Sequence, residues 1–222
     1  MAESYYGAEL LRVRKAIQVL LEYNAQHMQQ HSREHFKTFI ELQTPRATVL
    51  TCSDSRVQMH AIDPFPANDL FVVRNIGNQL ATAEGSIEYG VRHLHTPLLL
   101  VLGHVRCGAI EAAHGDYSKE SAAIRLELDT LHVDKSRGLL ENVLENVHRQ
   151  VSEALVIFDS EVRKGEVLVA GAVYDFANDF NCGYGKLIFT DLNNLRIIHQ
   201  NPVEIKSYDE SLLALIDRLA SL

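Results

Sequence analysis

The chain has 222 residues, which is long enough for one substantial hydrophobic core or at most two small ones. Its content of 46% apolar and 23% charged residues is that of an ordinary globular protein. Because 21 Lys and Arg stand against 29 Asp and Glu, the net charge of −8 argues against nucleic acid or an anionic membrane as a partner.

The first residues, the apolar runs and the cysteines of the sequence indicate the cellular compartment of the protein. Residues 1–4 are polar and acidic, with no apolar segment behind them, so we expect no secretory signal. No apolar run approaches the ~20 residues that a membrane span needs. The three cysteines are odd in number and unlike a disulfide framework in spacing. We therefore expect a cytoplasmic protein in which paired cysteines bind a metal.

The hydrophobic pattern is helical at first and then alternates between strands and helices. Residues 7–42 read as two helices, with a break at 31–34, Ser32 as the second N-cap, and an end at Pro45. The pattern then predicts strands over 47–52, 69–74, 97–103 and 166–174, and helices around 82–94 and 119–163. An antiparallel pair over 186–190 and 195–199, with Asn193 and Asn194 in its turn, and a helix over 211–222 complete the chain.

This alternation is typical of an α/β protein with a mostly parallel central β-sheet, an antiparallel edge, flanking helices and an N-terminal helical extension. No repeat, linker or low-complexity segment interrupts it, so we predict a single domain over 1–222. Within it we expect a helical N-terminal arm (1–44), an α/β core (45–200) and a C-terminal segment with a helix (201–222). The arm is a candidate for contact with a partner subunit.

Chemically active side chains follow two of the predicted strands. Cys52, Asp54 and Arg56 come directly after strand 47–52, and His104 and Cys107 follow strand 97–103. If these strands are parallel neighbours or near neighbours, their carboxyl ends open on the same edge of the sheet. Two thiolates and one imidazole then converge there.

Two cysteines and one histidine form a three-ligand zinc set that leaves a fourth tetrahedral position for water. Soft thiolates with imidazole favour zinc over magnesium, calcium or manganese. Each residue also has a plainer interpretation, because a lone Cys is often a small core residue and a His a satisfied core side chain. A structural zinc site needs a fourth protein ligand, for which Cys182 is available in a late turn.

Asp54 and Arg56 are close enough in sequence to Cys52 to act at the open metal position. Asp54 can accept a hydrogen bond from bound water there, or ligate the metal itself. Arg56 can hold Asp54 off the metal through a bidentate ion pair. The plainer interpretation is a surface ion pair at a strand end, which contributes little.

Several separated motifs, dense over residues 43–110, together resemble a β-class carbonic anhydrase. They are Cys-Ser-Asp-Ser-Arg from Cys52, residues 71–78 (FVVRNIGN), residues 87–89 (IEY), and Gly-His-x-x-Cys-Gly from Gly103. The resemblance implies a zinc lyase with one Zn²⁺ per chain, which hydrates CO2 reversibly to bicarbonate and a proton by attack of zinc-bound hydroxide. It implies Cys52, His104 and Cys107 as the metal ligands, with Asp54 and Arg56 as the catalytic dyad.

The same resemblance implies a substrate site and an assembly. Gln43, Phe71, Tyr89 and Gly108 match residues that bind substrate in the family. The family further implies a homodimer or a higher even-numbered homo-oligomer, with pocket residues shared across the interface.

Some members of the family carry a bicarbonate-controlled switch that swings the aspartate onto zinc. Arg74 and Tyr174 resemble residues of that inhibitory pocket, but Val49 stands where those members have a tryptophan. We therefore expect the pocket to be absent and the open state to be favoured. Arg106, between two ligands, and Ala109, in place of a frequent glycine, are smaller departures.

Three points stay open at the level of sequence. His60 is one candidate proton shuttle among 11 histidines, because an unperturbed imidazole titrates near pH ~6.5. COS or CS2, which are also small, apolar and linear, could replace CO2 as substrate, and sulfide release would distinguish them. A third interpretation, after hydration of CO2 and of COS or CS2, is a zinc-stabilised binding protein without turnover. The presence of both Asp54 and Arg56 argues against it.

Overall fold

The computed structural model describes residues 2–193, 195–197, 213–214 and 216. The chain divides into two compact units, Met1–Thr44 and Pro45–Leu222. The boundary between the two units coincides with the end of the predicted N-terminal arm at residue 44. That the whole chain forms a single domain stays a prediction. The N-terminal unit holds α1 (Ala2–Gln30) and α2 (Arg33–Lys37), with Ser32 extended between them at φ −75° and ψ 167°. The break lies where the sequence predicts it, but the second helix ends at Lys37, five residues before the predicted end at residue 42.

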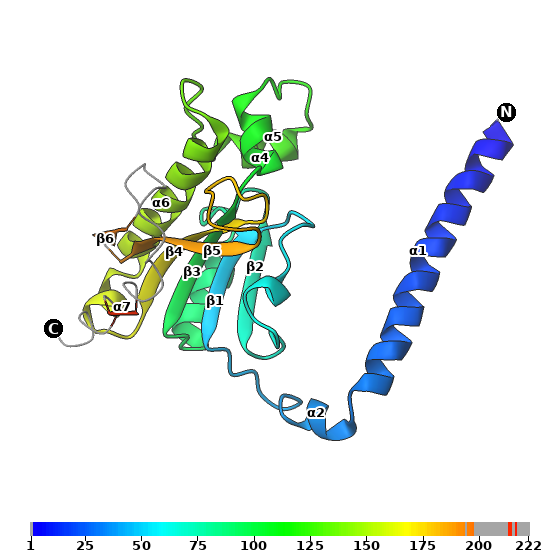
Figure 1. Cartoon of the computed structure of the whole chain (residues 1–222), viewed down its shortest axis with the longest axis horizontal. Coiled ribbons are helices and arrows are strands. Elements are labelled where there is room, and N and C mark those ends of the chain that lie inside the picture. The colour runs from blue at the N-terminus through cyan, green and yellow to red at the C-terminus, as the bar shows by residue number, and fades with distance from the viewer. Residues whose placement is uncertain (1, 194, 198–212, 215, 217–222) are drawn as a thin grey trace. The chain divides into compact units, whose positions relative to one another are not determined.

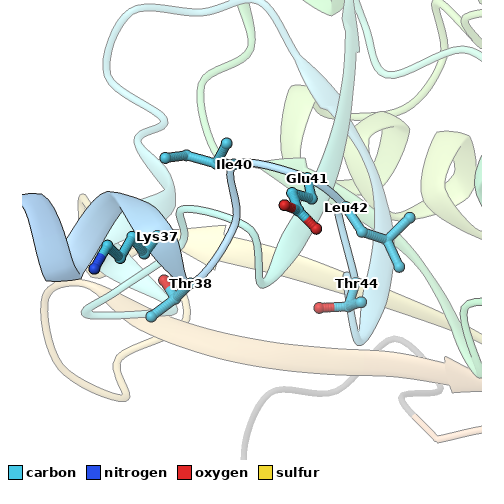
Figure 2. Close-up of a pocket in the computed structure, with 6 residues that line it drawn as sticks. All are labelled: Lys37, Thr38, Ile40, Glu41, Leu42 and Thr44. Atoms are coloured by element: carbon cyan, nitrogen blue, oxygen red, sulfur yellow. The ribbon is translucent and has the colours of Figure 1, made fainter.

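Within the N-terminal unit, aromatic rings line the break between the two helices. The ring centroids of His27 and His31 are 4.2 Å apart, and those of His31 and His35 are 4.3 Å apart. Beyond α2 the chain curves around a pocket of about 560 Å³ (Figure 2). Residues that line this pocket are Lys37, Thr38, Ile40, Glu41, Leu42 and Thr44.

The second unit is built on a six-stranded sheet with the order β2-β1-β3-β4-β5-β6 (Figure 1). Its strands are β1 (Ala47–Cys52), β2 (Leu70–Asn75), β3 (Leu98–His104), β4 (Leu168–Asp175), β5 (Lys186–Leu192) and β6 (Leu195–Arg196). The four strands from β2 to β4 run parallel, whereas β5 and β6 are antiparallel. The predicted fold class, a mostly parallel sheet with an antiparallel edge, is confirmed.

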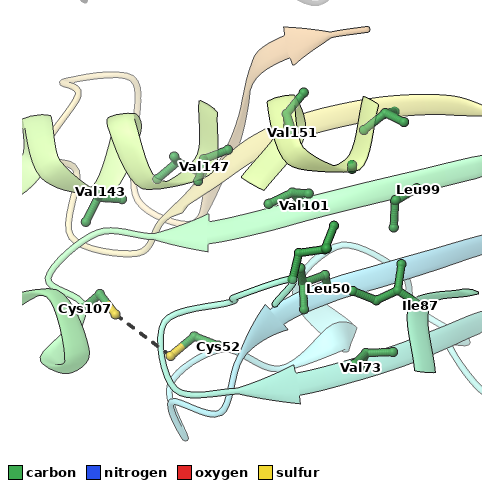
Figure 3. Close-up of a cluster of buried hydrophobic side chains, with 14 of the residues drawn as sticks. Leu50, Cys52, Val73, Ile87, Leu99, Val101, Cys107, Val143, Val147 and Val151 are labelled. Atoms are coloured by element: carbon green, nitrogen blue, oxygen red, sulfur yellow. Dashed lines mark hydrogen bonds between the residues drawn. The ribbon is translucent and has the colours of Figure 1, made fainter. Parts of the chain in front are cut away.

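The core lies between the central strands and α6 (Leu139–Ile157). Every residue of β1 is buried, as expected for a strand covered on both faces. Val143, Val147 and Val151 recur along one side of α6 and pack toward β3 (Figure 3). A Cβ atom added to Gly103 would lie only 2.5 Å from Cγ2 of Val147, so the helix approaches β3 closely where that strand ends.

The shorter helices connect the strands at the two edges of the sheet. They are η1 (Met59–Ala61), α3 (Glu84–Glu88), the π-helix η2 (Tyr89–His93), α4 (Gly108–His114), α5 (Ala122–Asp129) and α7 (Asp159–Arg163). Figure 1 shows α4 and α5 at the edge where β1 and β3 end, and α7 at the opposite edge.

The helix predicted over 119–163 is wrong as a single element, because the stretch contains α5, α6 and α7. His132 adopts φ +50°, and Gly138 is the extended N-cap of α6, so the backbone cannot stay helical between α5 and α6. The Asp134 carboxylate accepts the Ser136 N–H and closes a turn there. The sequence reading also missed α4.

The end of the chain is described only in part. Residues 198–199 of the predicted last strand and Asn194 of its turn lie outside the described residues. So does the segment 201–222 with its predicted helix, apart from residues 213, 214 and 216. Of the helices in the described part of the chain, none is both long and apolar enough to cross a membrane.

Candidate metal centre

Two adjacent strands carry the candidate ligands to one edge of the sheet. β1 ends at Cys52 and β3 at His104, and the two strands are parallel neighbours with Thr51 opposite Leu102. Cys107 follows β3 after a tight turn and is the N-cap of α4. Parallel neighbours place their carboxyl ends together, which is the arrangement expected from the sequence.

The three side chains converge. One ligating atom from each of Cys52, His104 and Cys107 lies within 4.8 Å of the other two, and all three residues are buried. The two sulfur atoms are 3.9 Å apart (Figure 3). Cys182 is not part of this group, and its thiol donates to the carbonyl of Phe180 at 3.2 Å. In the described part of the chain, no other three acidic, histidine or cysteine side chains gather in this way.

The imidazole of His104 is oriented for metal ligation. Its Nδ1 lies 2.9 Å from the carbonyl oxygen of Val105, which can only accept, so Nδ1 carries the proton. Nε2 then holds the lone pair, and it is buried with no hydrogen-bond partner among the described residues. Buried polar atoms are nearly always satisfied, so this orphaned nitrogen fits a cation bound beside the sulfur atoms.

The electrostatics of the thiol pair point the same way. The contact with Cys107 holds the pKa of Cys52 well below its ordinary value, at about 4, against the opposing effect of burial. The same contact and burial raise the pKa of Cys107. A divalent cation, if bound by both cysteines, would stabilise both as thiolates. Two thiolates and one imidazole are a soft donor set that fits zinc.

A second layer of hydrogen bonds holds Cys52. The backbone N–H of Gly77, a residue with φ +82°, donates to the sulfur at 3.4 Å. The carbonyl of Gly77 in turn accepts from the buried Asn146 side chain of α6 at 2.9 Å. Such partners orient a ligand and tune its donor strength.

Asp54 and Arg56 form a bidentate pair beside the cluster. Arg56 Nε donates to Asp54 Oδ1 at 2.9 Å, and Nη2 donates to Oδ2 at 2.7 Å. These bonds lower the pKa of Asp54 to about 2, so the carboxylate is ionised at neutral pH. Its Oδ2 lies 3.8 Å from Nε2 of His104. The carboxylate therefore stands within reach of the position where a cation would sit.

The predicted aromatic residues of the substrate pocket lie together but away from the cluster in one chain. The ring centroids of Phe71 and Tyr89 are 5.8 Å apart. Phe71 pairs with Thr48, whereas Cys52 pairs with Asn75, four residues further along β2. At roughly 3.3 Å per residue this is about 13 Å of strand. A single described chain does not bring these rings to Cys52.

The remaining predicted residues have separate positions. Gln43 belongs to the N-terminal unit, next to Leu42 and Thr44 of the pocket there. Gly108 begins α4, and a Cβ atom at this position would meet nothing within 4 Å. His60 is exposed in η1. Their predicted roles, substrate binding for Gln43 and Gly108 and proton transfer for His60, stay predictions.

The residues that resemble an inhibitory pocket have structural contacts of their own. Val49 is fully buried in β1. Arg74 donates to the carbonyls of Cys52 at 3.0 Å and Val57 at 2.8 Å, and so ties the end of β1 to the following loop. Tyr174 lies opposite His104 in the sheet register.

The structure adds residues to the site that the sequence reading did not assign to it. Arg56 also donates to the carbonyl of Arg106, whose side chain pairs with Asp179. Phe176 stacks with the His104 ring at a centroid distance of 6.1 Å. Asp179 and Phe176 follow β4, at least 120 positions after Asp54 and Arg56, and no spacing in the sequence points to them.

Comparisons with known proteins agree on one family. A family model described as carbonic anhydrase matches residues 47–180, more than half of the chain. Over 168 residues the chain is 28% identical to β carbonic anhydrase 5 of Arabidopsis thaliana, a chloroplast protein, covering 65% of this chain and 56% of that one. A carbonic anhydrase of Synechococcus elongatus is 30% identical over 186 residues, covering 73% of this chain and 68% of that one.

A solved structure has the same fold. It is one of two tetrameric β-carbonic anhydrases from Sordaria macrospora, with a TM-score of 0.62 and 22% sequence identity. The superposition covers 80% of this chain and 95% of that one. The matches to the two curated relatives cover only part of those proteins, little more than half of the Arabidopsis protein and about two thirds of the Synechococcus protein.

Proposed function

Because this chain belongs to the β-class carbonic anhydrases, we propose that it catalyses the reversible hydration of CO2 to bicarbonate and a proton. One observation carries the proposal: the ligating atoms of Cys52, His104 and Cys107 lie within 4.8 Å of one another, with an ionised carboxylate beside them. The proposed cofactor is one Zn²⁺ per chain. When bound, zinc supplies a Lewis acid that brings the pKa of a coordinated water towards neutrality.

The ligands are prepared by their surroundings. Nδ1 of His104 keeps its proton on the Val105 carbonyl, which leaves Nε2 free to bind zinc. The Gly77 N–H supports the negative charge of the Cys52 thiolate. Three protein ligands leave one tetrahedral position, which is the arrangement of a catalytic rather than a structural site.

Asp54 orients the attacking water. As an ionised carboxylate, Asp54 can only accept a hydrogen bond, so it directs the water's proton toward itself and a lone pair toward CO2. Arg56 keeps Asp54 ionised and holds both of its oxygens. The buried surroundings strengthen these contacts, because the side chain of Asp54 is only 14% exposed.

A second copy of the chain completes the substrate pocket in this proposal. Phe71 and Tyr89 lie together but about 13 Å of strand away from the register position of Cys52. We propose that these rings, with Gln43, line the pocket of a neighbouring subunit in an even-numbered homo-oligomer. The two Sordaria macrospora β-carbonic anhydrases are tetrameric, which is consistent with such an assembly. Gly108, at the start of α4, is proposed to contact substrate within the same chain.

Asp54→Asn tests the dyad without changing the volume of the side chain. It removes the charge and leaves an amide that cannot accept on both atoms, so we expect CO2 hydration to fall by about 100-fold or more at unchanged zinc content. The matched control is Asp116→Asn, which changes an exposed aspartate outside the site and should leave hydration and zinc content at wild-type levels.

The measurements are stopped-flow CO2 hydration, zinc content by mass spectrometry, and sulfide release from COS. Wild-type activity in Asp54→Asn would refute the role of the dyad. Full zinc occupancy with sulfide release but no CO2 hydration would show that CO2 is not the substrate. Bound zinc with neither CO2 hydration nor sulfide release would indicate a zinc-binding protein without catalytic activity.

A further inference from the structure

A rigid turn after β4 lies against the candidate active site. The carboxylate of Asp175, fully buried at the end of β4, accepts three backbone N–H groups. They come from Ala177 at 3.2 Å, Asp179 at 3.0 Å and Phe180 at 2.9 Å. One buried acceptor therefore fixes the course of residues 176–180.

One side chain of this turn contacts Arg56 directly, and a second contacts Arg106, whose carbonyl binds Arg56. The Phe176 ring lies 4.9 Å from the guanidinium carbon of Arg56, within range of a cation–π contact. The Asp179 carboxylate accepts from Arg106, with Nε–Oδ2 at 3.1 Å and Nη2–Oδ1 at 2.8 Å. This is a bidentate fork, the most directional form of ion pair.

The fork holds a residue in an unusual conformation. Arg106 lies between the ligands His104 and Cys107 and has φ +54°, a left-handed conformation that a side chain disfavours. In this conformation its carbonyl oxygen accepts from Nη2 of Arg56 at 2.9 Å. Backbone strain of this kind persists only where surrounding contacts hold it. Asp179 supplies two of those contacts.

Arg56 needs such support because its side chain is 47% exposed. An ion pair at that exposure, taken alone, fixes a long side chain only weakly, and this holds for Arg106 as well, whose side chain is 62% exposed. What supports the Arg106 pair is its partner, because the backbone N–H of Asp179 is anchored on the buried Asp175 carboxylate. The Arg56 guanidinium is held by both oxygens of Asp54, by the Arg106 carbonyl and by the Phe176 ring. The last two contacts depend on the turn at 176–180.

We propose that Asp179 is a positioning residue. Through Arg106 it fixes the Arg56 guanidinium, and through Arg56 it fixes the Asp54 carboxylate beside the metal centre. The inference rests on the proposed function for its catalytic consequence. Its structural part, the immobilisation of Arg56, can be measured without turnover.

Asp179→Asn and Arg106→Ala remove the two partners of the fork in turn. Asp179→Asn keeps the side-chain shape but removes the charge. Arg106→Ala removes the guanidinium but keeps a Cβ atom, so the left-handed backbone at 106 stays disfavoured and loses the contacts that hold it. The control is Asp159→Asn, which breaks an exposed pair with Arg163 far along the chain.

The first readout is the side-chain Nε–H signal of Arg56 in nitrogen-15 NMR spectra, assigned by its loss in Arg56→Lys. We expect its exchange with water to be about tenfold faster in Asp179→Asn and in Arg106→Ala, and no faster in the double variant than in either one. The second readout is CO2 hydration, where kcat should fall by about tenfold with KM and zinc content unchanged. Asp159→Asn should match wild type in both.

The outcomes separate the inference from the proposed function. Unchanged Arg56 exchange in both single variants would overturn the inference and reduce the Asp179–Arg106 contact to a surface ion pair. Additive effects in the double variant would also overturn it, because the two residues would then act independently. Faster exchange in a protein that does not hydrate CO2 would support the positioning of Arg56 and contradict the proposed function.

Discussion

Substituting Gly103, the residue before the candidate ligand His104, tests how closely α6 must approach β3. A Cβ atom at position 103 would lie 2.5 Å from Cγ2 of Val147, while its next neighbours stand at ordinary distances of 3.7 and 3.8 Å. Gly103→Ala must therefore displace Val147 or the helix that carries it. Overpacking of this kind costs about 1–3 kcal/mol in the free energy of unfolding.

Val147→Ala is the partner substitution, because it removes the atom that clashes. Val147 is fully buried, so losing two methyl groups costs about 1.6 kcal/mol in transfer free energy, and the cavity raises this to about 2–3 kcal/mol. If the two changes were independent, their costs would add to about 3–6 kcal/mol. Because the Cβ atom added by Gly103→Ala occupies the space that Val147→Ala vacates, the double variant should lose only about 2 kcal/mol in the free energy of unfolding.

The assay is urea unfolding followed by circular dichroism at a fixed protein and zinc concentration. Val151→Ala is the control, since Val151 is buried on the same helix but is not among the nearest neighbours of Gly103. Combined with Gly103→Ala it should give additive costs within about 0.5 kcal/mol. A Gly103→Ala, Val147→Ala double variant whose cost equals the sum of the single costs would refute the packing argument.

Asn146→Leu should lower the affinity for zinc by about tenfold, because it removes the hydrogen bond that holds the Gly77 turn, whose N–H donates to Cys52. Competition with a chromophoric chelator measures the affinity, and an unchanged value would contradict the role of Asn146. The Arg92 guanidinium lowers the pKa of Glu161 below its ordinary 4.5, so their pair stabilises the fold above that pH and is lost as pH falls through the lowered pKa. Glu161→Gln should therefore cost about 1 kcal/mol near pH 7 and almost nothing near pH 3 in urea unfolding, and an equal cost at both would count against this linkage.

The parts of the site that the sequence could predict are those governed by strand ends. Cys52 and His104 each follow an apolar run, and parallel neighbours carry such residues to one edge of the sheet. Local pattern was enough to place them together. The bidentate ion pair between Asp54 and Arg56 was predictable from their two-residue spacing, and the observed fork confirms it.

The parts that the sequence could not predict depend on contacts between distant segments or on register. Asp179 meets Arg106 across 73 positions, through a turn whose shape is set by the buried Asp175. Phe71 has the right residue type for an apolar pocket, but only the strand register shows that it lies four residues from the level of Cys52.

If the Cys52, His104 and Cys107 cluster binds the zinc on which CO2 hydration depends, activity must follow the zinc content of the protein. Stopped-flow CO2 hydration can be measured while zinc is removed by a chelator and then added back in known amounts. We expect activity to vanish with the metal and to rise linearly up to one zinc per chain. Hydration that persists after zinc is removed, or that stays absent at one zinc per chain, would contradict this dependence on zinc.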